Sequence, residues 1–411
     1  MSADLYATST APAPALEIDT DSHLEGVAEA QQIAREFTQP RVGDAAERIR
    51  QNIYSLEHVT LNIAVTGNAG SGKSTFVNAL RGLSNDDEGA AKSGVTETTR
   101  TPAAYPHPSM PNVTIWDLPG IGTPNFKAKT YLSDVHFERY DFFIILTSER
   151  FKENDINLAK AIKKKKRRFY FIRSKVDNDI NAESRKRDFS QEHLLSKIRE
   201  DCQKNLKDVG NPKVFLISSF YLQDYDFEKL VDTLEKELPE NKKHALIQSL
   251  PVYSIEALQR KKKHFQRLIW LTAFGSGVIA VVPVPGLTLV CDYGIVTSFL
   301  ENVFRSFGLE DTSLQKLATR VKGLDWMDLK AEMKSGFKDG ITTKAVTSYF
   351  KTPSMAAIMT LKGLMSSVIP FAQLPAGAVS VPVMHYLLNK GLKEMEGDAR
   401  AVLVKAKLHF V

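Results

Sequence analysis

One short segment constrains the fold of this chain more than any other feature. The apolar run 61–66 leads directly into Gly67-Asn-Ala-Gly-Ser-Gly-Lys-Ser74, which has the G-x-x-x-x-G-K-S spacing of a phosphate-binding loop between a strand and a helix. Glycines allow the backbone to wrap around phosphates, while the amides and the helix N-terminus supply positive potential. The segment predicts a bound nucleoside triphosphate. The predicted contacts are Gly67, Asn68, Ala69, Gly70, Ser71, Gly72, Lys73, Ser74 and Thr75.

Two side chains of this loop have further predicted roles. Lys73 adds a point charge at the β- and γ-phosphates, and the Ser74 hydroxyl ligates Mg²⁺. The alternative is a glycine turn followed by a chance Lys-Ser, and the strand pattern directly before Gly67 argues against it.

Short β-rich runs recur beyond the loop and predict an α/β fold. They cover 61–66, 113–116, 142–147, 169–172 and 214–217, and amphipathic stretches such as 154–164 and 191–206 separate them. Buried strands alternating with helices predict an α/β P-loop domain, with a mostly parallel sheet and helices on both faces. Ligands of such sheets lie at the C-terminal ends of the strands.

The flanking segments differ from this pattern. With 411 residues, 43% of them hydrophobic, the chain is long enough for two or three domains. We predict a disordered N-terminus over 1–23, a helical segment over 24–58 with helices at 24–37 and 42–53, the P-loop domain over 59–240, and a C-terminal helical domain over 241–411, where long Leu-, Ala-, Met- and Lys-rich stretches replace the β signal.

A second motif follows the loop at the expected distance. The run 113–116 ends in Asp117-Leu-Pro-Gly120, which matches D-x-x-G. Asp117 can hold Mg²⁺ through water, and the Gly120 amide can contact the γ-phosphate and release when it leaves. Between the two motifs, 93–99 is a polar, Thr-rich loop. We expect Thr99 to ligate the metal, with Thr98 the next choice, whereas a solvated loop is the alternative.

A third motif selects the base. The run 169–172 leads through Arg173 into Ser174-Lys-Val-Asp177, an [ST]-K-x-D signature. The Asp177 carboxylate can accept hydrogen bonds from the N1–H and 2-amino groups of guanine, whereas adenine would place an acceptor against that charge. The Lys175 stem can lie over the purine ring. Ser218 and Ser219 end the last strand, where a backbone amide can reach the guanine O6.

Taken together, these segments resemble the interferon-inducible, immunity-related GTPases. The resemblance rests on 67–74, the loop 94–99, the motif 116–122, the strand 140–145 and the motif 174–177, and it weakens in the C-terminal third. It implies a Ras-like G domain between an N-terminal and a C-terminal helical region, GTP-dependent self-association, and action at intracellular or pathogen-containing membranes in cell-autonomous defence. It also implies the nucleotide and Mg²⁺ roles of Lys73 and Ser74, the switch role of Thr99, and Glu97 as a candidate for positioning water.

One departure from small signalling GTPases has a mechanical consequence. Ile121 follows Gly120, so no glutamine stands there to orient the attacking water. We expect slow hydrolysis in the monomer, with a second copy completing the site by repositioning Glu97 or lending a polar group. A solvated switch-loop carboxylate is the alternative. The candidate catalytic residues are Lys73, Glu97, Thr99 and Gly120, and the candidate Mg²⁺ ligands are Ser74, Thr99 and, through water, Asp117.

Apolar and basic segments leave the relation to membranes open. The stretches 268–291 and 363–389 are long enough to reach across a bilayer but contain several Gly and Pro residues, so they form either buried core or lipid-inserting segments. The basic run 260–263 faces either water or anionic lipid, and the run 163–168 is expected as an exposed helix end.

The N-terminus and the cysteine count indicate the cellular compartment. The N-terminus lacks a secretory signal and only two cysteines are present, which favours a reducing, cytoplasmic setting. The family resemblance implies partial association with intracellular membranes. No nucleic-acid-binding module is visible.

Three functions compete on these motifs. The leading one is an Mg²⁺-dependent GTPase that self-associates and works at membranes. A GTP-dependent recruitment switch or scaffold with negligible hydrolysis is the second, and the missing glutamine favours it. An ATP-using kinase or transporter subunit is disfavoured by 174–177.

Overall fold

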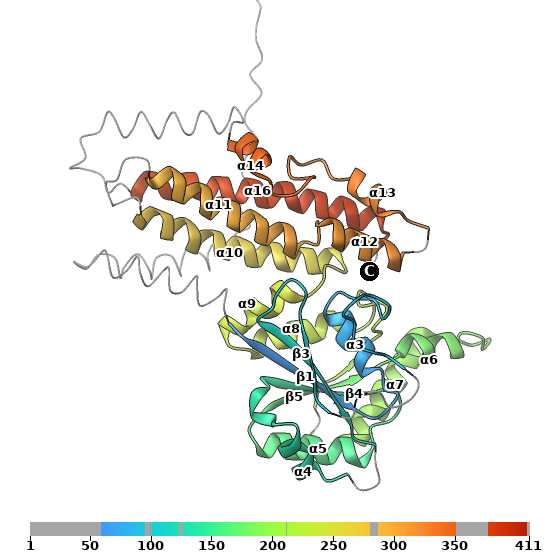
Figure 1. The fold of residues 1–411 in the computed structure, drawn as a ribbon. Helices are drawn as coiled ribbons and strands as arrows, with labels where there is room; N and C mark the ends of the chain where they lie inside the picture. The colour runs from blue at the N-terminus through green and yellow to red at the C-terminus, as the bar shows by residue number, and fades with distance from the viewer. Residues whose placement is uncertain are drawn as a thin grey trace, which may run out of the picture.

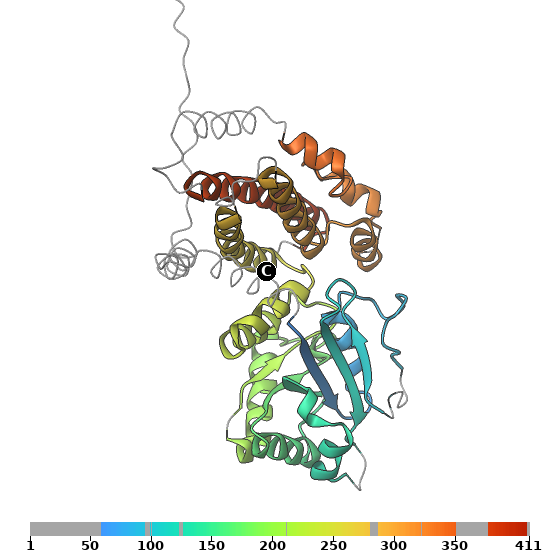
Figure 2. The ribbon, with the colours of Figure 1, turned by 60° about the vertical axis from the view of Figure 1, so that its left-hand side comes forward.

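The computed structural model describes residues 59–94, 99, 101–122, 126–210, 212–279, 287–321, 323–350 and 377–408. A twisted sheet with helices on both sides forms one part of the molecule, and a bundle of long helices packs at one end of it (Figures 1 and 2). The helices predicted at 24–37 and 42–53 lie outside the described residues.

The sheet has six strands in the order β2-β3-β1-β4-β5-β6, and all pairs except β2–β3 are parallel. This confirms the predicted mostly parallel sheet and its five strands. The antiparallel β2 was not predicted, because it is a short edge strand with alternating partial exposure and it ends in a proline. The strands are β1 (Leu61–Gly67), β2 (Ala103–Pro106), β3 (Val113–Gly120), β4 (Phe142–Thr147), β5 (Arg168–Arg173) and β6 (Val214–Leu216).

Alternating side chains of each strand enter two different cores. On β4, Phe142, Ile144 and Leu146 belong to one cluster, while Phe143 and Ile145 belong to the other. This period of two is what a strand buried on both faces requires. The first cluster is covered by α3 (Lys73–Leu80), α8 (Phe227–Glu237) and α9 (Glu240–Ser249), and the second by α4 (Ala128–Asp134), α5 (Glu153–Lys164), α7 (Gln191–Asn205), η1 (Phe137–Arg139) and η2 (Lys207–Val209).

The described residues after 250 that form regular structure are helical. The long helices α10 and α16 pack along each other, and α11 packs against both. Their apolar faces form a third core, separate from the two of the sheet. The helices are α10 (Ile255–Ile279), α11 (Leu287–Ser306), α12 (Asp311–Arg320), α13 (Trp326–Ala331), α14 (Thr343–Phe350) and α16 (Gly377–Lys405).

The two apolar stretches fall largely on these helices. The stretch 268–291 covers the end of α10 and the start of α11, and the stretch 363–389 includes the start of α16, while 280–286 and 363–376 lie outside the described residues. Within the described part of the chain, we find no helix that combines the length and the apolar character needed to cross a bilayer.

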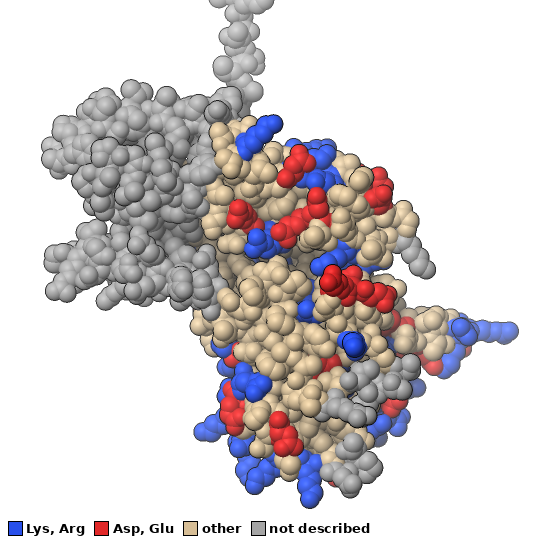
Figure 3. Space-filling model, viewed as in Figure 1, with Lys and Arg blue, Asp and Glu red and all other residues tan. Residues whose placement is uncertain are grey.

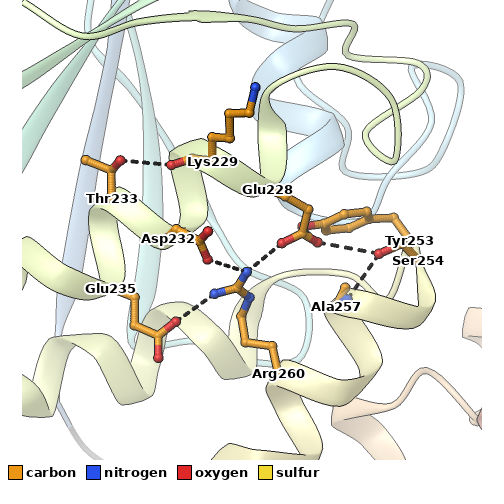
Figure 4. A network of polar contacts seen from close by, with 9 residues as sticks. All are labelled: Glu228, Lys229, Asp232, Thr233, Glu235, Tyr253, Ser254, Ala257 and Arg260. Carbon is orange, nitrogen blue, oxygen red and sulfur yellow. Dashed lines mark hydrogen bonds and ion pairs between the residues drawn. The ribbon is translucent and has the colours of Figure 1, made fainter. Parts of the chain in front are cut away.

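The basic run 260–263 joins the helical bundle to the sheet domain. The Arg260 guanidinium lies 2.6 Å from Glu228, 2.7 Å from Asp232 and 2.7 Å from Glu235, three carboxylates on one face of α8 (Figure 4). Lys261 is buried, and Lys262 forms a 3.0 Å ion pair with Glu396 of α16. The run is therefore neither a fully solvated face nor a lipid-facing one, since three of its four side chains make contacts within the protein.

Charges elsewhere on the surface are mixed. On the face shown in Figure 3, Lys and Arg side chains lie among Asp and Glu side chains over both the sheet domain and the helical region. The run 163–168 lies at the end of α5, with Lys163 to Lys166 exposed, which confirms the predicted exposed helix end.

Candidate functional site

The phosphate-binding segment connects β1 to α3 at the C-terminal edge of the sheet. Gly67, Gly70 and Gly72 have φ values of 143°, 74° and 89°, a region that favours glycine. A Cβ on Gly67 would lie 1.9 Å from the Leu146 carbonyl oxygen of β4, so only glycine fits between these two strands. Local sequence and strand packing therefore both require this loop shape.

The start of α3 is suited to an anion. It has neither a side-chain cap nor an acidic residue in its first turn, so its first backbone amides face the loop. Lys73 begins the helix and donates to the carbonyl oxygens of Gly67 at 3.2 Å and Asn68 at 3.1 Å. These bonds hold the ammonium over the loop. Asn68, Ala69, Gly70, Ser71 and Gly72 form the turn, and Ser74 and Thr75 follow on α3.

Three predicted metal ligands meet beside this loop. The Asp117 Oδ2 atom accepts from Ser74 Oγ at 2.6 Å and from Thr99 Oγ1 at 3.1 Å. The other oxygen, Asp117 Oδ1, is buried and has no hydrogen-bond partner among the described residues. Burial raises the pKa of Asp117, although the hydrogen bonds and the charge of Lys73 oppose this.

This group of oxygens fits Mg²⁺. The ion prefers oxygen ligands and is usually held by one or two carboxylates together with substrate phosphates and water. A divalent cation would also compensate the buried carboxylate oxygen that has no protein donor. Ser74, Thr99 and Asp117 would hold it, and the phosphate loop lies next to them. Thr96, Glu97 and Thr98 lie outside the described residues.

The D-x-x-G motif lies directly beside the phosphate loop. Gly120 ends β3 in register with Gly67 of β1, and the Ile121 amide donates to the Gly67 carbonyl at 3.3 Å. The Ile121 side chain is fully buried in the core between the sheet and α4, α5 and α7. The residue at the glutamine position of small GTPases therefore contributes packing and carries no polar group toward the phosphates.

The guanine motif packs on the phosphate loop from the other side. Ser174 Oγ lies 2.7 Å from the Ser71 carbonyl oxygen, and Lys175 Nζ lies 2.7 Å from that of Gly70. Lys175 has φ 58° and immediately precedes the short helix α6 (Val176–Glu183), whose first turn contains the half-buried Asp177. Phosphate and base recognition are therefore brought to one edge, although more than 100 positions separate the two motifs.

The second predicted base contact lies on the neighbouring strand. Ser218 is buried and Ser219 half-buried just after β6, which pairs with β5 in parallel. Ser218 Oγ accepts from the Phe220 amide at 3.3 Å, an arrangement typical of a turn. The side chains of Phe220 and Tyr221 are 66% and 50% exposed beside this edge.

Two buried polar residues behind the site were missed by the sequence analysis. Asp155 in the first turn of α5 accepts from Asn68 Nδ2 at 3.4 Å and from the Lys152 amide at 2.8 Å. Burial raises the pKa of Asp155 to about 6. Its sequence signal was an acidic residue at the start of a helix, which reads as an ordinary cap.

Tyr131 of α4 is the second missed residue. Its hydroxyl lies 2.7 Å from Thr66 Oγ1 and 2.9 Å from the Pro119 carbonyl oxygen. It therefore links the helix after the D-x-x-G motif to the strand that enters the phosphate loop. No local pattern in the sequence marks this tyrosine.

Comparisons with known proteins agree with this geometry. A family model described as interferon-inducible GTPase matches residues 27–393. Interferon-inducible GTPase 5 of Rattus norvegicus is 38% identical over 402 residues, which cover 97% of this chain and 87% of the relative. Interferon-gamma-inducible GTPase 10 of Mus musculus is 41% identical over 71% of this chain and 69% of the relative. Interferon-inducible GTPase 1 of Mus musculus is 40% identical over 69% and 68%.

Proposed function

This chain belongs to the interferon-inducible GTPase family and is a GTPase, and on that premise we propose that it hydrolyses GTP to GDP and phosphate in an Mg²⁺-dependent reaction, that self-association activates it, and that it acts at intracellular membranes. The observation that carries this proposal is the convergence of Ser74, Thr99 and Asp117 beside a loop that also contacts the guanine motif. The family name supports a part in cell-autonomous defence.

The residues have the following roles in the proposal. Lys73 and the amides of 67–75 bind the β- and γ-phosphates, and the charge of Lys73 stabilises the transition state. Ser74 and Thr99 would provide hydroxyl ligands for Mg²⁺, Asp117 would hold it through water, and the ion would neutralise phosphate charge when bound. Gly120 donates its amide to the γ-phosphate.

In this proposal, residues that follow the C-terminal ends of β5 and β6 select the base. Asp177 accepts from guanine, Lys175 covers the purine ring, and Ser174, Ser218 and Ser219 shape the pocket around it. These are hydrogen-bonding roles, so GTP should bind far more tightly than ATP.

In this proposal, self-association completes the catalytic site, because one chain lacks a group that positions the attacking water. Because Ile121 is buried, water has to be positioned by another group, and we assign this to Glu97 once a second copy meets the nucleotide edge. The exposed side chains of Phe220 and Tyr221 support an interface between two copies at this edge, since aromatic side chains are enriched at protein interfaces.

The domain and membrane assignments belong to the same proposal. The predicted segments 1–23 and 24–58 lie outside the described residues. We propose a G domain over 59–240 and a helical domain over 241–411 that contacts the membrane surface from the cytoplasmic side. The resemblance to the family supports the membrane role.

A recruitment switch is the second candidate, and the buried Ile121 favours it. In that case GTP holds one conformation that binds partners, and hydrolysis is negligible.

One assay separates the two functions. GTP hydrolysis is measured over a hundredfold range of protein concentration with Mg²⁺, beside EDTA, ATP and Lys73→Ala arms. Specific activity that rises with concentration and needs Mg²⁺ and Lys73 supports the self-activating GTPase. Tight GTP binding without turnover at any concentration points to the recruitment switch, and a flat specific activity contradicts activation by self-association.

A further inference from the structure

A cavity of about 430 Å³ lies where the sheet domain meets the helical bundle. Its walls come from the end of α3, the turn between β2 and β3, the α9–α10 connection, the end of α11, and faces of α12 and α16. Figure 1 shows α12 facing α3 across this junction. The phosphate loop is at the opposite end of α3, roughly 12 Å away for a helix of this length. The cavity is therefore distinct from the nucleotide site.

The charged side chains of the cavity wall are mainly basic. Arg81, Arg305, Lys316 and Arg320 line it, and Glu310 is the one carboxylate among the lining residues. Glu310 is paired with Arg305 at 3.5 Å. Among the described residues, no carboxylate lies within 4 Å of the charged groups of the other three, whereas Arg260 and Lys262 elsewhere in the junction form ion pairs. Asp87 attracts the Arg320 guanidinium from beyond that distance, so the wall carries an excess of positive charge that the protein compensates only in part.

A buried lysine behind the wall adds to this charge. Lys261 is 2% exposed, and its ammonium donates to the Gln248 carbonyl at 2.7 Å and to Ser306 Oγ at 2.9 Å. Gln248 and Ser306 both line the cavity. The partners of Lys261 are neutral, and burial lowers the pKa of Lys261 to about 7, so near pH 7 it adds only part of a positive charge to the cavity.

The pKa of His107 is also affected by these positive charges. His107 lines the cavity, and its pKa is lowered to about 3, first by burial and then by the charges of Lys261, Arg81 and Lys316. His107 is therefore neutral near pH 7 and leaves the cations to set the sign of the potential.

Helix C-termini at the cavity are another reason for basic side chains there, because these helix ends carry partial negative charge. The C-terminal ends of α3, α9 and α11 border the cavity, each with about half a negative charge, and the N-terminus of α12 adds about half a positive one. Arg81 uses two donors on the carbonyls of Pro106 at 3.1 Å and Gly89 at 2.9 Å. These contributions offset only part of the charge of the basic side chains.

We propose that this cavity binds a small anion that carries several phosphate groups. Arg81, Lys316 and Arg320 supply charge-assisted donors, and Thr312 and Ser313 supply hydroxyls from the first turn of α12. The volume lies within the range of small-molecule sites. The ligand would join α3 and the β2–β3 turn of the sheet domain to α11 and α12 of the bundle, so that it stabilises their contact. A soluble polyphosphate and an inositol phosphate headgroup share this chemistry.

The test uses the full chain loaded with GDP and Mg²⁺, so that the phosphate loop is occupied. Inositol hexakisphosphate is titrated in a calorimeter at low and high ionic strength, and vesicles of phosphatidylcholine with or without phosphatidylinositol bisphosphate form a second arm. Lys316→Gln/Arg320→Gln is the cavity variant, because both side chains reach the surface and their loss leaves the core intact. Lys344→Gln, an exposed lysine of α14, is the matched control.

Wild type and the control should bind inositol hexakisphosphate, more weakly at high salt, with affinity about hundredfold lower in the double variant, or tenfold for each cation removed. Vesicle binding that the double variant loses identifies the lipid headgroup as the source, and binding of the soluble probe alone identifies a free anion. Absence of binding up to millimolar concentrations overturns the proposal. Equal affinity in wild type and double variant does so as well.

Discussion

Replacing Arg260 with alanine should weaken the contact between the sheet domain and the helical bundle. The side chain is 17% exposed, and it contacts carboxylates that are 25%, 51% and 29% exposed. Burial lowers the pKa of Arg260, but attraction to Glu228, Asp232 and Glu235 outweighs this and raises it, so the group stays charged. Its loss leaves three carboxylates close together on α8 (Figure 4).

The expected loss of unfolding free energy follows from the exposure of each ion pair. Charge-assisted hydrogen bonds contribute about 1.5–3 kcal/mol when buried and about 0.2–1 kcal/mol when exposed. Three partly exposed contacts therefore give a loss of about 2–3 kcal/mol. With a change of about 2–4 °C per kcal/mol for a unit of this size, the Tm should fall by roughly 4–12 °C.

Calorimetric unfolding of the GDP-bound protein measures this loss. Lys236→Ala, an exposed lysine on the same helix, is the control and should change the Tm little. Asp232→Ala removes the most exposed partner and should cost about 0.5 kcal/mol. If Arg260→Ala is as stable as the Lys236 control, the network does not hold the two parts together.

Three further outcomes follow from the site. Asp177→Asn should lower GTP affinity by about 10–100-fold, because an amide cannot accept both guanine donors, and it should allow xanthosine triphosphate to bind, which competition with a fluorescent nucleotide would measure. Asp155 has a folded-state pKa raised by burial to about 6, above its ordinary 3.8, so its contribution to stability is complete below pH 4 and is lost as the pH rises through 6. Denaturant unfolding should therefore show Asp155→Asn gaining up to about 3 kcal/mol on wild type between pH 4 and pH 7, and parallel pH profiles would contradict this. Gly67→Ala should abolish GTP binding, since its Cβ would lie 1.9 Å from the Leu146 oxygen, whereas Gly336→Ala, with open space around it, should bind normally.

The strands and the motifs could be predicted because their signals are local. A run such as 142–147 alternates between two apolar environments whatever its partners are, and G-x-x-x-x-G-K-S needs only a strand before it and a helix after it. Each motif follows the C-terminal end of a strand, and parallel strands end at the same edge of a sheet, so the sequence also implied that the motifs meet at one edge. The fold class, the GTPase assignment and the family resemblance followed from these patterns and agree with the structure and the comparisons.

Contacts between distant segments were decided only by the tertiary structure. Asp155 was not singled out from the sequence, Arg260 was interpreted as part of a solvated or lipid-facing basic run, and β2 was not predicted. Asp155 contacts Asn68, 87 positions away, Arg260 contacts carboxylates 25 to 32 positions away, and β2 pairs with the nearby strand β3, so packing rather than local sequence sets each environment. Burial then decides whether a charged group is paired, shifted in pKa or left facing a cavity, and no residue's local sequence carries that information.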